Sequence, residues 1–246
     1  MRRLVIGALI LGAPLLFRFF LVEPVLADST GSISGRVVLV GEAPKPKKIE
    51  IKKDTEKCGT EKLAEDLVVS PDRGIKNAVV SLLGAKGKPA KPDGNIVLDQ
   101  KGCVFDPHVL IVPAGTPLDI LYNEGLIHNF HAYSTKNPPV NKAQPPFKKK
   151  MTETFTHPEV FKITCDFHPW MQGWVVVTDN PYVVATDGGG TFKLTDVPAG
   201  THTVEVWHET LGKVTKQVTV KAGEEAKVTF ELTKKGAKGG NSHEFH

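Results

Sequence analysis

Nearly every apolar pattern after residue 27 has a period of two, the spacing that places side chains on one face of a β-strand. The runs are short, and turn sequences such as Pro113-Ala114-Gly115 and Pro198-Ala199-Gly200 separate them. The clearest runs are Ile33/Val37/Leu39, Ala78/Val80/Leu82, Val204/Val206 and Val228/Phe230/Leu232. Residues 55–67 are the best helical candidate, although their period is weak. We therefore predict an all-β protein built from sandwich or barrel units.

Turn positions and composition divide the chain into regions. Gly and Pro together make up 41 of 246 residues, an aperiodic excess that favours many turns and excludes collagen. The predicted regions are a signal peptide at 1–27, an N-terminal β region at 28–94, a histidine-rich β unit at 95–178, a strand–turn–strand series at 179–234 and a disordered tail at 235–246.

The N-terminus has the pattern of a secretory signal. Arg2 and Arg3 precede an apolar run from Leu4 to Phe17, and small residues stand before Asp28. An uncleaved anchor is the alternative, because residues 19–22 extend the apolar stretch beyond Arg18. With the signal cleaved, no membrane span is expected. Both interpretations place the folded chain outside the cytoplasm, in the periplasm or secreted, where disulfides persist.

The charge balance argues against some partners. The whole chain has a formal net charge of +4, and removal of residues 1–27 leaves 28 basic against 26 acidic residues, or +2. Such a balance is too weak to indicate binding to nucleic acid or to an anionic membrane.

One local constellation points to chemistry. Cys165, His168 and Met171 follow one another at spacings of three, and His128 supplies a second imidazole from further upstream. A thiolate, two imidazoles and a weak thioether are the ligand set of a blue-copper centre, which predicts one type 1 copper per chain. Zinc is the alternative metal, because Cys and two His also suit Zn²⁺.

Residues 95–178 contain a further set of motifs: Phe105-Asp106-Pro107, Pro113-Ala114-Gly115-Thr116, Tyr122-Asn123-Glu124, His128-Asn129 and the short Cys165-x-x-His168-x-x-Met171 loop. With these motifs the segment resembles a cupredoxin, the plastocyanin and amicyanin family with its Greek-key β-sandwich. Position by position, the resemblance implies that His128, Cys165, His168 and Met171 are the copper ligands.

The same resemblance implies roles around the ligands. Asn129 is expected to tie the two ligand segments together through hydrogen bonds. The far edge of the loop histidine is expected in an apolar surface patch, which would place Pro169 and Trp170 near the docking surface for a redox partner.

Residues 181–234 contain the turn and strand motifs Asp187-Gly188-Gly189-Gly190-Thr191-Phe192 and Val197-Pro198-Ala199-Gly200. With these motifs the segment resembles a second module, the carboxypeptidase regulatory-like, transthyretin-type sandwich, and Gly31–Val37 and Lys76–Val80 are similar to its first strands. One arrangement inserts the cupredoxin unit into this smaller sandwich, at a loop tip of the kind that tolerates insertion. The other makes the N-terminal region an independent extension.

The remaining cysteines are Cys58 and Cys103. In an oxidising compartment, a disulfide between them would leave Cys165 free for the metal and fasten the N-terminal region to the copper unit. Two buried free thiols are the alternative.

Together these features predict an electron carrier that exchanges single electrons with a redox protein donor and acceptor. Alternatives from other classes are a copper storage or delivery protein, and a structural or carbohydrate-binding-like surface protein. We predict no enzyme and no catalytic residues, because the chain lacks the His-x-His pairs and the His-Cys-His run of multicopper oxidases.

Overall fold

The computed structural model describes residues 29–87, 89 and 93–234. The predicted signal peptide at 1–27 and the tail at 235–246 lie outside these residues. The predicted all-β class is confirmed, because strands dominate this part of the chain and its helix is a single turn. No helix in the described ranges is long and apolar enough to cross a membrane.

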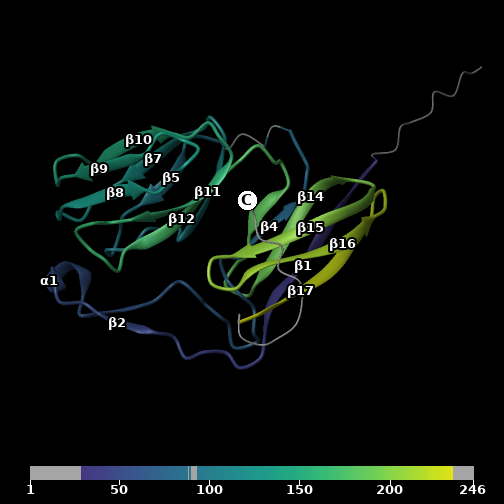
Figure 1. Ribbon diagram of the computed structural model, residues 1–246, viewed down its shortest axis with the longest axis horizontal. Helices are drawn as coiled ribbons and strands as arrows, with labels where there is room; N and C mark the ends of the chain where they lie inside the picture. The colour runs from purple at the N-terminus through teal and green to yellow at the C-terminus, as the bar shows by residue number, and fades with distance from the viewer. Residues whose placement is uncertain (1–28, 88, 90–92, 235–246) are drawn as a thin grey trace, which may run out of the picture.

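One unit of the molecule is a sandwich of two sheets, drawn in teal and green in Figure 1. The larger sheet has the order β6-β12-β11-β8-β9, with β6 at Val109–Pro113, β8 at His128–Ala132, β9 at Val140–Gln144, β11 at Glu159–Thr164 and β12 at Gln172–Thr178. The smaller sheet has the order β10-β7-β5, with β5 at Ile96–Asp99, β7 at Pro117–Leu121 and β10 at Lys150–Thr154. Alternate side chains from both sheets share one buried core, which includes Leu98, Ile120, Phe130, Phe161 and Val175.

The second unit, here called the outer sandwich, also has two sheets. One has the order β14-β1-β17, with β1 at Thr30–Val40, β14 at Thr191–Pro198 and β17 at Glu225–Thr233. The other has the order β13-β4-β15-β16, with β4 at Val79–Leu82, β13 at Val183–Ala185, β15 at Gly200–His208 and β16 at Gly212–Val220. The alternating residues Ile33, Val37 and Leu39 all point into its core. Gly35 lies between them, and a Cβ there would lie 1.8 Å from the Val228 carbonyl oxygen, so the parallel pairing of β1 with β17 requires glycine.

The outer sandwich is built from strands on both sides of residues 96–178 in the sequence. β1 pairs with β14 and β17, and β4 pairs with β13 and β15. The chain leaves after β4, builds the unit of residues 96–178, and returns at β13. That unit is therefore an insertion in the outer sandwich, and we call it the inserted unit.

The region 28–94, treated as one piece from the sequence, is divided in the structure. β1 and β4 belong to the outer sandwich, whereas residues 48–63 leave it and lie along the inserted unit (Figure 1). We call residues 48–63 the strap. Its elements are β2 (Lys48–Glu50), α1 (Thr55–Cys58) and β3 (Glu61–Leu63), and β2 pairs with β3.

The helix expected at 55–67 is only one turn long. Gly59 follows Cys58 at a φ of 77°, a conformation open to glycine, and its N–H closes the turn on the Thr55 carbonyl. β3 begins two residues later. The end of the helix is set by this turn and by the burial of Cys58 in the core of the inserted unit.

A small apolar contact joins the two units. Val79 of the outer sandwich packs with Val109 and Val176 of the inserted unit. The rings of Trp174 and Trp207 meet edge-on, with their centroids 5.2 Å apart. Glu209 accepts a hydrogen bond from Trp174 Nε1 at 2.7 Å and also contacts the buried His108 ring. These contacts cross from one unit to the other and hold them together.

The carboxylate of Glu159 organises the loop that follows β8. It accepts hydrogen bonds from Ser134 Oγ, from the N–H and hydroxyl of Thr135 and from the N–H of Lys136. Burial tends to raise the pKa of Glu159, but these hydrogen bonds outweigh it and lower the pKa from 4.5 to about 2.

Glu159→Gln should therefore make the free energy of unfolding depend less on pH in acid. A carboxylate with a lowered folded pKa contributes stability above its unfolded pKa of 4.5, and that stability is lost as pH falls toward 2. In urea titrations, we expect the unfolding free energy of wild type to fall over this window, and that of Glu159→Gln to start lower and change less. Glu231→Gln, at an exposed carboxylate, is the control. Parallel curves for wild type and Glu159→Gln would contradict the prediction.

Candidate metal centre

Two segments of the inserted unit supply the predicted ligands. His128 is the first residue of β8, which pairs with β9 and β11. Cys165, His168 and Met171 lie in the loop between β11 and β12. This loop closes on itself, because the Met171 N–H donates to the His168 carbonyl at 2.8 Å and the Cys165 N–H donates to the Met171 carbonyl at 3.1 Å. All four side chains are buried.

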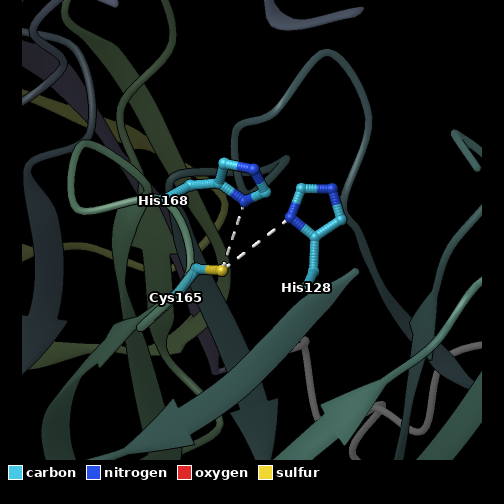
Figure 2. A group of neighbouring side chains, drawn as sticks. All are labelled: His128, Cys165 and His168. Atoms are coloured by element: carbon cyan, nitrogen blue, oxygen red, sulfur yellow. Dashed lines mark hydrogen bonds between the residues drawn. The ribbon is translucent and has the colours of Figure 1, made fainter. Parts of the chain in front are cut away.

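The thiol and both imidazoles converge on one point, as Figure 2 shows. Cys165 Sγ lies 3.8 Å from Nδ1 of His128 and 3.6 Å from Nδ1 of His168. A metal with a sulfur bond of about 2.3 Å and nitrogen bonds of about 2.0 Å, spread by 120°, would separate sulfur from nitrogen by about 3.7 Å. Both sulfur–nitrogen distances therefore fit a single metal ion shared by the three donor atoms.

Asn129 links the two ligand segments. Its Oδ1 accepts the Asp166 N–H at 2.6 Å, and its Nδ2 donates to the Asp166 carboxylate at 2.9 Å. A further bond of 2.6 Å runs from Asn129 Nδ2 to Asn141 on β9. Asp166 directly follows Cys165, so these bonds hold β8 against the loop of residues 165–171, here called the ligand loop. This is the linkage that the sequence led us to expect of Asn129.

Burial sets the protonation of the donors. It lowers the pKa of His128 to about 4, aided by the nearby imidazole of His168 and opposed by Glu124, so the His128 ring is neutral at pH 7. Burial raises the pKa of the Cys165 thiol, while backbone N–H groups of Asn129, Phe167 and His168 act in the opposite direction. A neutral imidazole is the form that binds a metal, and a thiol must lose its proton to do so.

Both imidazoles have a carboxylate on the side away from Cys165. Asp54 of the strap contacts His168 Nε2 at 2.9 Å through its Oδ2. Glu124 Oε2 lies 3.6 Å from His128 Nε2, and the same carboxylate accepts the N–H groups of Gly102 and Cys103. Reasoning from sequence gave no role to Asp54 or Glu124. The spacing of Glu124, four residues before His128, was the one local signal available.

Residues 173–233 match the family model of the carboxypeptidase regulatory-like domain. The match runs from β12 to β17 and so covers the later strands of the outer sandwich. A search of curated proteins found no match.

Parts of the chain are also similar to solved copper proteins. A copper-containing nitrite reductase from Thermus scotoductus is 20% identical over 37% of this chain and 25% of its own, with a TM-score of 0.32. A purple cupredoxin from Nitrosopumilus maritimus is 20% identical over 34% of this chain and 100% of its own, with a TM-score of 0.30. A reduced Cu(I) form of an amicyanin variant is 22% identical over 40% of this chain and 98% of its own, with a TM-score of 0.32. This chain thus spans a quarter of the reductase.

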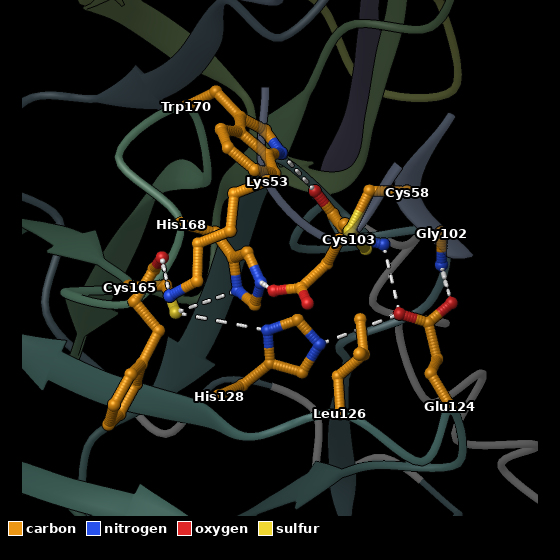
Figure 3. The surroundings of a disulfide bond; sticks show 12 residues. Lys53, Cys58, Gly102, Cys103, Glu124, Leu126, His128, Cys165, His168 and Trp170 are labelled. Atoms are coloured by element: carbon orange, nitrogen blue, oxygen red, sulfur yellow. Dashed lines mark hydrogen bonds and ion pairs between the residues drawn. A yellow bond between two sulfur atoms is a disulfide. The ribbon is translucent and has the colours of Figure 1, made fainter. Parts of the chain in front are cut away.

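The predicted disulfide is present between Cys58 and Cys103, with their Cα atoms 5.3 Å apart. It joins the strap to the inserted unit, close to the candidate metal centre (Figure 3). Cys165 is the free cysteine, and it is buried. The disulfide therefore leaves one thiol, the one that faces both imidazoles.

The surface around the loop histidine differs from the open apolar patch that the sequence resemblance implied. His168 has an exposed fraction of 0%, because Asp54 covers its outer nitrogen. Trp170 is half-buried, with its ring 5.1 Å from that of His168 and its Nε1 donating to the Cys103 carbonyl at 3.1 Å. Pro169 is exposed. The expectation of an open histidine edge was wrong, and a docking role for Pro169 and Trp170 stays a prediction.

His131, the other histidine of β8, lies outside the donor cluster. Its Nδ1 contacts Asp166 Oδ1 at 2.9 Å, and its ring stacks on Tyr133 with centroids 4.2 Å apart. It is partly exposed and three residues beyond His128, so the alternation of β8 separates the two rings.

Proposed function

We propose that this chain is an extracytoplasmic type 1 (blue) copper protein that carries single electrons between redox proteins. The observation that carries the proposal is the pair of imidazole Nδ1 atoms, at 3.6 and 3.8 Å, that face the buried Cys165 sulfur. A soft thiolate with two neutral imidazoles suits both Cu(I) and Cu(II). Under this proposal, one copper ion is held by His128, Cys165 and His168, with Met171 as a weak fourth ligand.

Copper, when bound, supplies a one-electron couple, and the chain keeps the ligand side chains in fixed positions. The hydrogen bonds of Asn129 to Asp166 keep β8 against the ligand loop. The backbone bonds that join Met171 to His168 and Cys165 keep the loop closed. A site that does not rearrange when its charge changes by one favours rapid electron transfer, because little reorganisation energy is required.

Zinc and an enzyme are less well supported. Structural zinc sites add a second Cys or a hard ligand, whereas the ligand loop here ends in Met171. The sequence also lacks the His-x-His pairs that a trinuclear copper centre would need. We therefore propose a carrier whose substrate is the electron of a partner protein, with no catalytic residues of its own.

Two further features support this assignment. The Cys58–Cys103 disulfide favours an oxidising compartment, as a periplasmic or secreted protein would meet. In the outer sandwich, Trp207 packs edge-on against Trp174, which favours a structural role for this ring over sugar stacking. We propose that the outer sandwich acts as the support for the copper unit.

The test is to add one equivalent of Cu(II) to the purified, metal-free protein. We expect an intense blue colour, a spin-resonance spectrum of type 1 shape, and reversible bleaching by a one-electron reductant with the copper retained. A colourless Cu(II) complex with an ordinary tetragonal spectrum would overturn the proposal. Blue colour followed by rapid loss of the reduced ion to a chelator would instead favour copper storage or delivery.

A further inference from the structure

The strap is held onto the inserted unit next to the ligand loop. Ile51 and Cys58 are buried in the core of that unit, and Cys58 is bonded to Cys103. Lys53 donates from Nζ to the Phe167 carbonyl at 3.1 Å and lies over the Phe167 ring, 5.6 Å from its centroid. Figure 3 shows Lys53 and the Cys58–Cys103 disulfide beside the imidazoles of His128 and His168. Three independent contacts therefore place the strap over the loop histidine.

Asp54 has an unusual place within the strap. It precedes α1, where an aspartate normally caps the helix with its carboxylate. Within the described chain, Asp54 makes no such capping bond, and its φ of 54° is left-handed. Its Oδ2 lies instead 2.9 Å from His168 Nε2. The backbone takes a left-handed conformation that few residues other than Gly, Asn and Asp adopt readily, and in it the carboxylate reaches the imidazole.

We propose that Asp54 is a positioning residue for the metal ligand His168, delivered by the strap from 114 residues away in the sequence. His168 Nε2–H donates to the Asp54 carboxylate, which leaves Nδ1 without a proton and directed at Cys165. The chemical class is that of carboxylate–histidine–metal triads, in which the outer carboxylate sets the tautomer and orientation of the ring and makes it a stronger ligand. This inference rests on the proposed function, because it assumes that His168 binds copper.

Two consequences follow from the position of this carboxylate. First, the negative charge lies next to a ligand, so it favours Cu(II) over Cu(I) and lowers the reduction potential. Second, the 34% exposed Asp54 side chain stands between solvent and the fully buried His168. The other imidazole differs, since Glu124 stays 3.6 Å from His128 Nε2, beyond hydrogen-bond distance. The proposal therefore concerns His168 alone.

The first test needs no metal and so does not depend on the proposed function. In nitrogen-15 NMR of the metal-free protein, we expect His168 to carry its proton on Nε2, with slow exchange against solvent. Asp54→Gly keeps the left-handed backbone and removes the acceptor, so the exchange of this proton should become fast. Glu56→Gly, an exposed carboxylate of the same helical turn, should leave it slow. A His168 proton on Nδ1, or equal exchange in the Asp54→Gly protein, would overturn the inference.

The second test uses the copper-loaded protein and separates charge from hydrogen bonding. Asn tolerates the left-handed conformation and keeps an oxygen acceptor, so Asp54→Asn should retain slow exchange at His168 but raise the reduction potential. Asp54→Gly should also lower Cu(II) affinity by about 10- to 100-fold, the usual cost of losing such a partner. A tenfold change in the Cu(II)-to-Cu(I) affinity ratio corresponds to about 59 mV for one electron.

The Glu56→Gln and Glu56→Gly proteins are the controls, with potential and affinity expected at wild-type values. Equal potentials for wild type, Asp54→Asn and Asp54→Gly would overturn the role of Asp54. If no variant and no wild-type sample binds copper as a blue centre, the proposed function fails, and the metal-free NMR result still decides whether Asp54 sets the tautomer of His168.

Discussion

Replacement of Cys165 by serine is expected to abolish the blue colour of the Cu(II)-loaded protein. The colour of a type 1 site requires a thiolate bound to copper, and a serine hydroxyl is a hard donor that does not replace it. Cys165 is the free thiol of the chain and is 1% exposed between the two imidazoles, so no other sulfur of its kind can substitute. The measurement is the visible spectrum after addition of one equivalent of Cu(II), with the fold checked by circular dichroism.

A matched pair of histidine variants sharpens this result. His128→Asn and His131→Asn change the same residue type three positions apart on β8. Because only His128 faces Cys165 Sγ, its replacement should weaken copper binding and alter the spectrum, while His131→Asn should stay blue. A blue Cys165→Ser protein, or an equal loss of copper binding in both histidine variants, would show that copper binds elsewhere.

Removal of the Cys58–Cys103 disulfide should lower the free energy of unfolding by about 4 kcal/mol. The bond closes a loop with a sequence separation of 45 residues, and the chain-entropy relation for that length gives this magnitude. Both half-cystines are buried in the core of the inserted unit, so the double variant Cys58→Ser/Cys103→Ser also places two hydroxyls in apolar surroundings. Urea unfolding of wild type and the double variant, both metal-free, measures the difference.

The double variant has a second expected effect. Without the disulfide, the strap loses one of the contacts that hold Asp54 against His168, so the reduction potential should rise as it does in Asp54→Gly. The blue colour should persist, because no ligand has changed. Thiol titration of the unfolded wild-type protein supplies the control, with one free thiol expected. Three free thiols, or an unchanged unfolding free energy, would contradict the prediction.

The ligand loop could be predicted from sequence because its information is local. Cys165, His168 and Met171 lie within seven residues, and backbone bonds among these same residues close the loop. The strands could be predicted for a similar reason, since apolar residues at every second position indicate which face of a strand is buried. Val204 and Val206, for example, alternate in the sequence and are fully buried in β15.

The surroundings of the ligands could not be predicted in this way. Residues 52–54, Lys-Lys-Asp, look like an exposed polar stretch, and nothing near them in sequence indicates a partner at His168. The contact depends on the path of the strap across the inserted unit, on the disulfide and on the left-handed backbone of Asp54. The weak helical pattern at 55–67 failed for the same reason, because Gly59 and the burial of Cys58 ended the helix after one turn.

By itself, the sequence determined the all-β class and the candidate donor set, because side-chain chemistry and strand period are properties of neighbouring residues. Only the tertiary structure decided that the loop histidine is closed to solvent and backed by a carboxylate. That arrangement joins residues 114 positions apart. Contacts at such separations are set by how the two sandwiches and the strap pack, and packing follows from the whole chain at once.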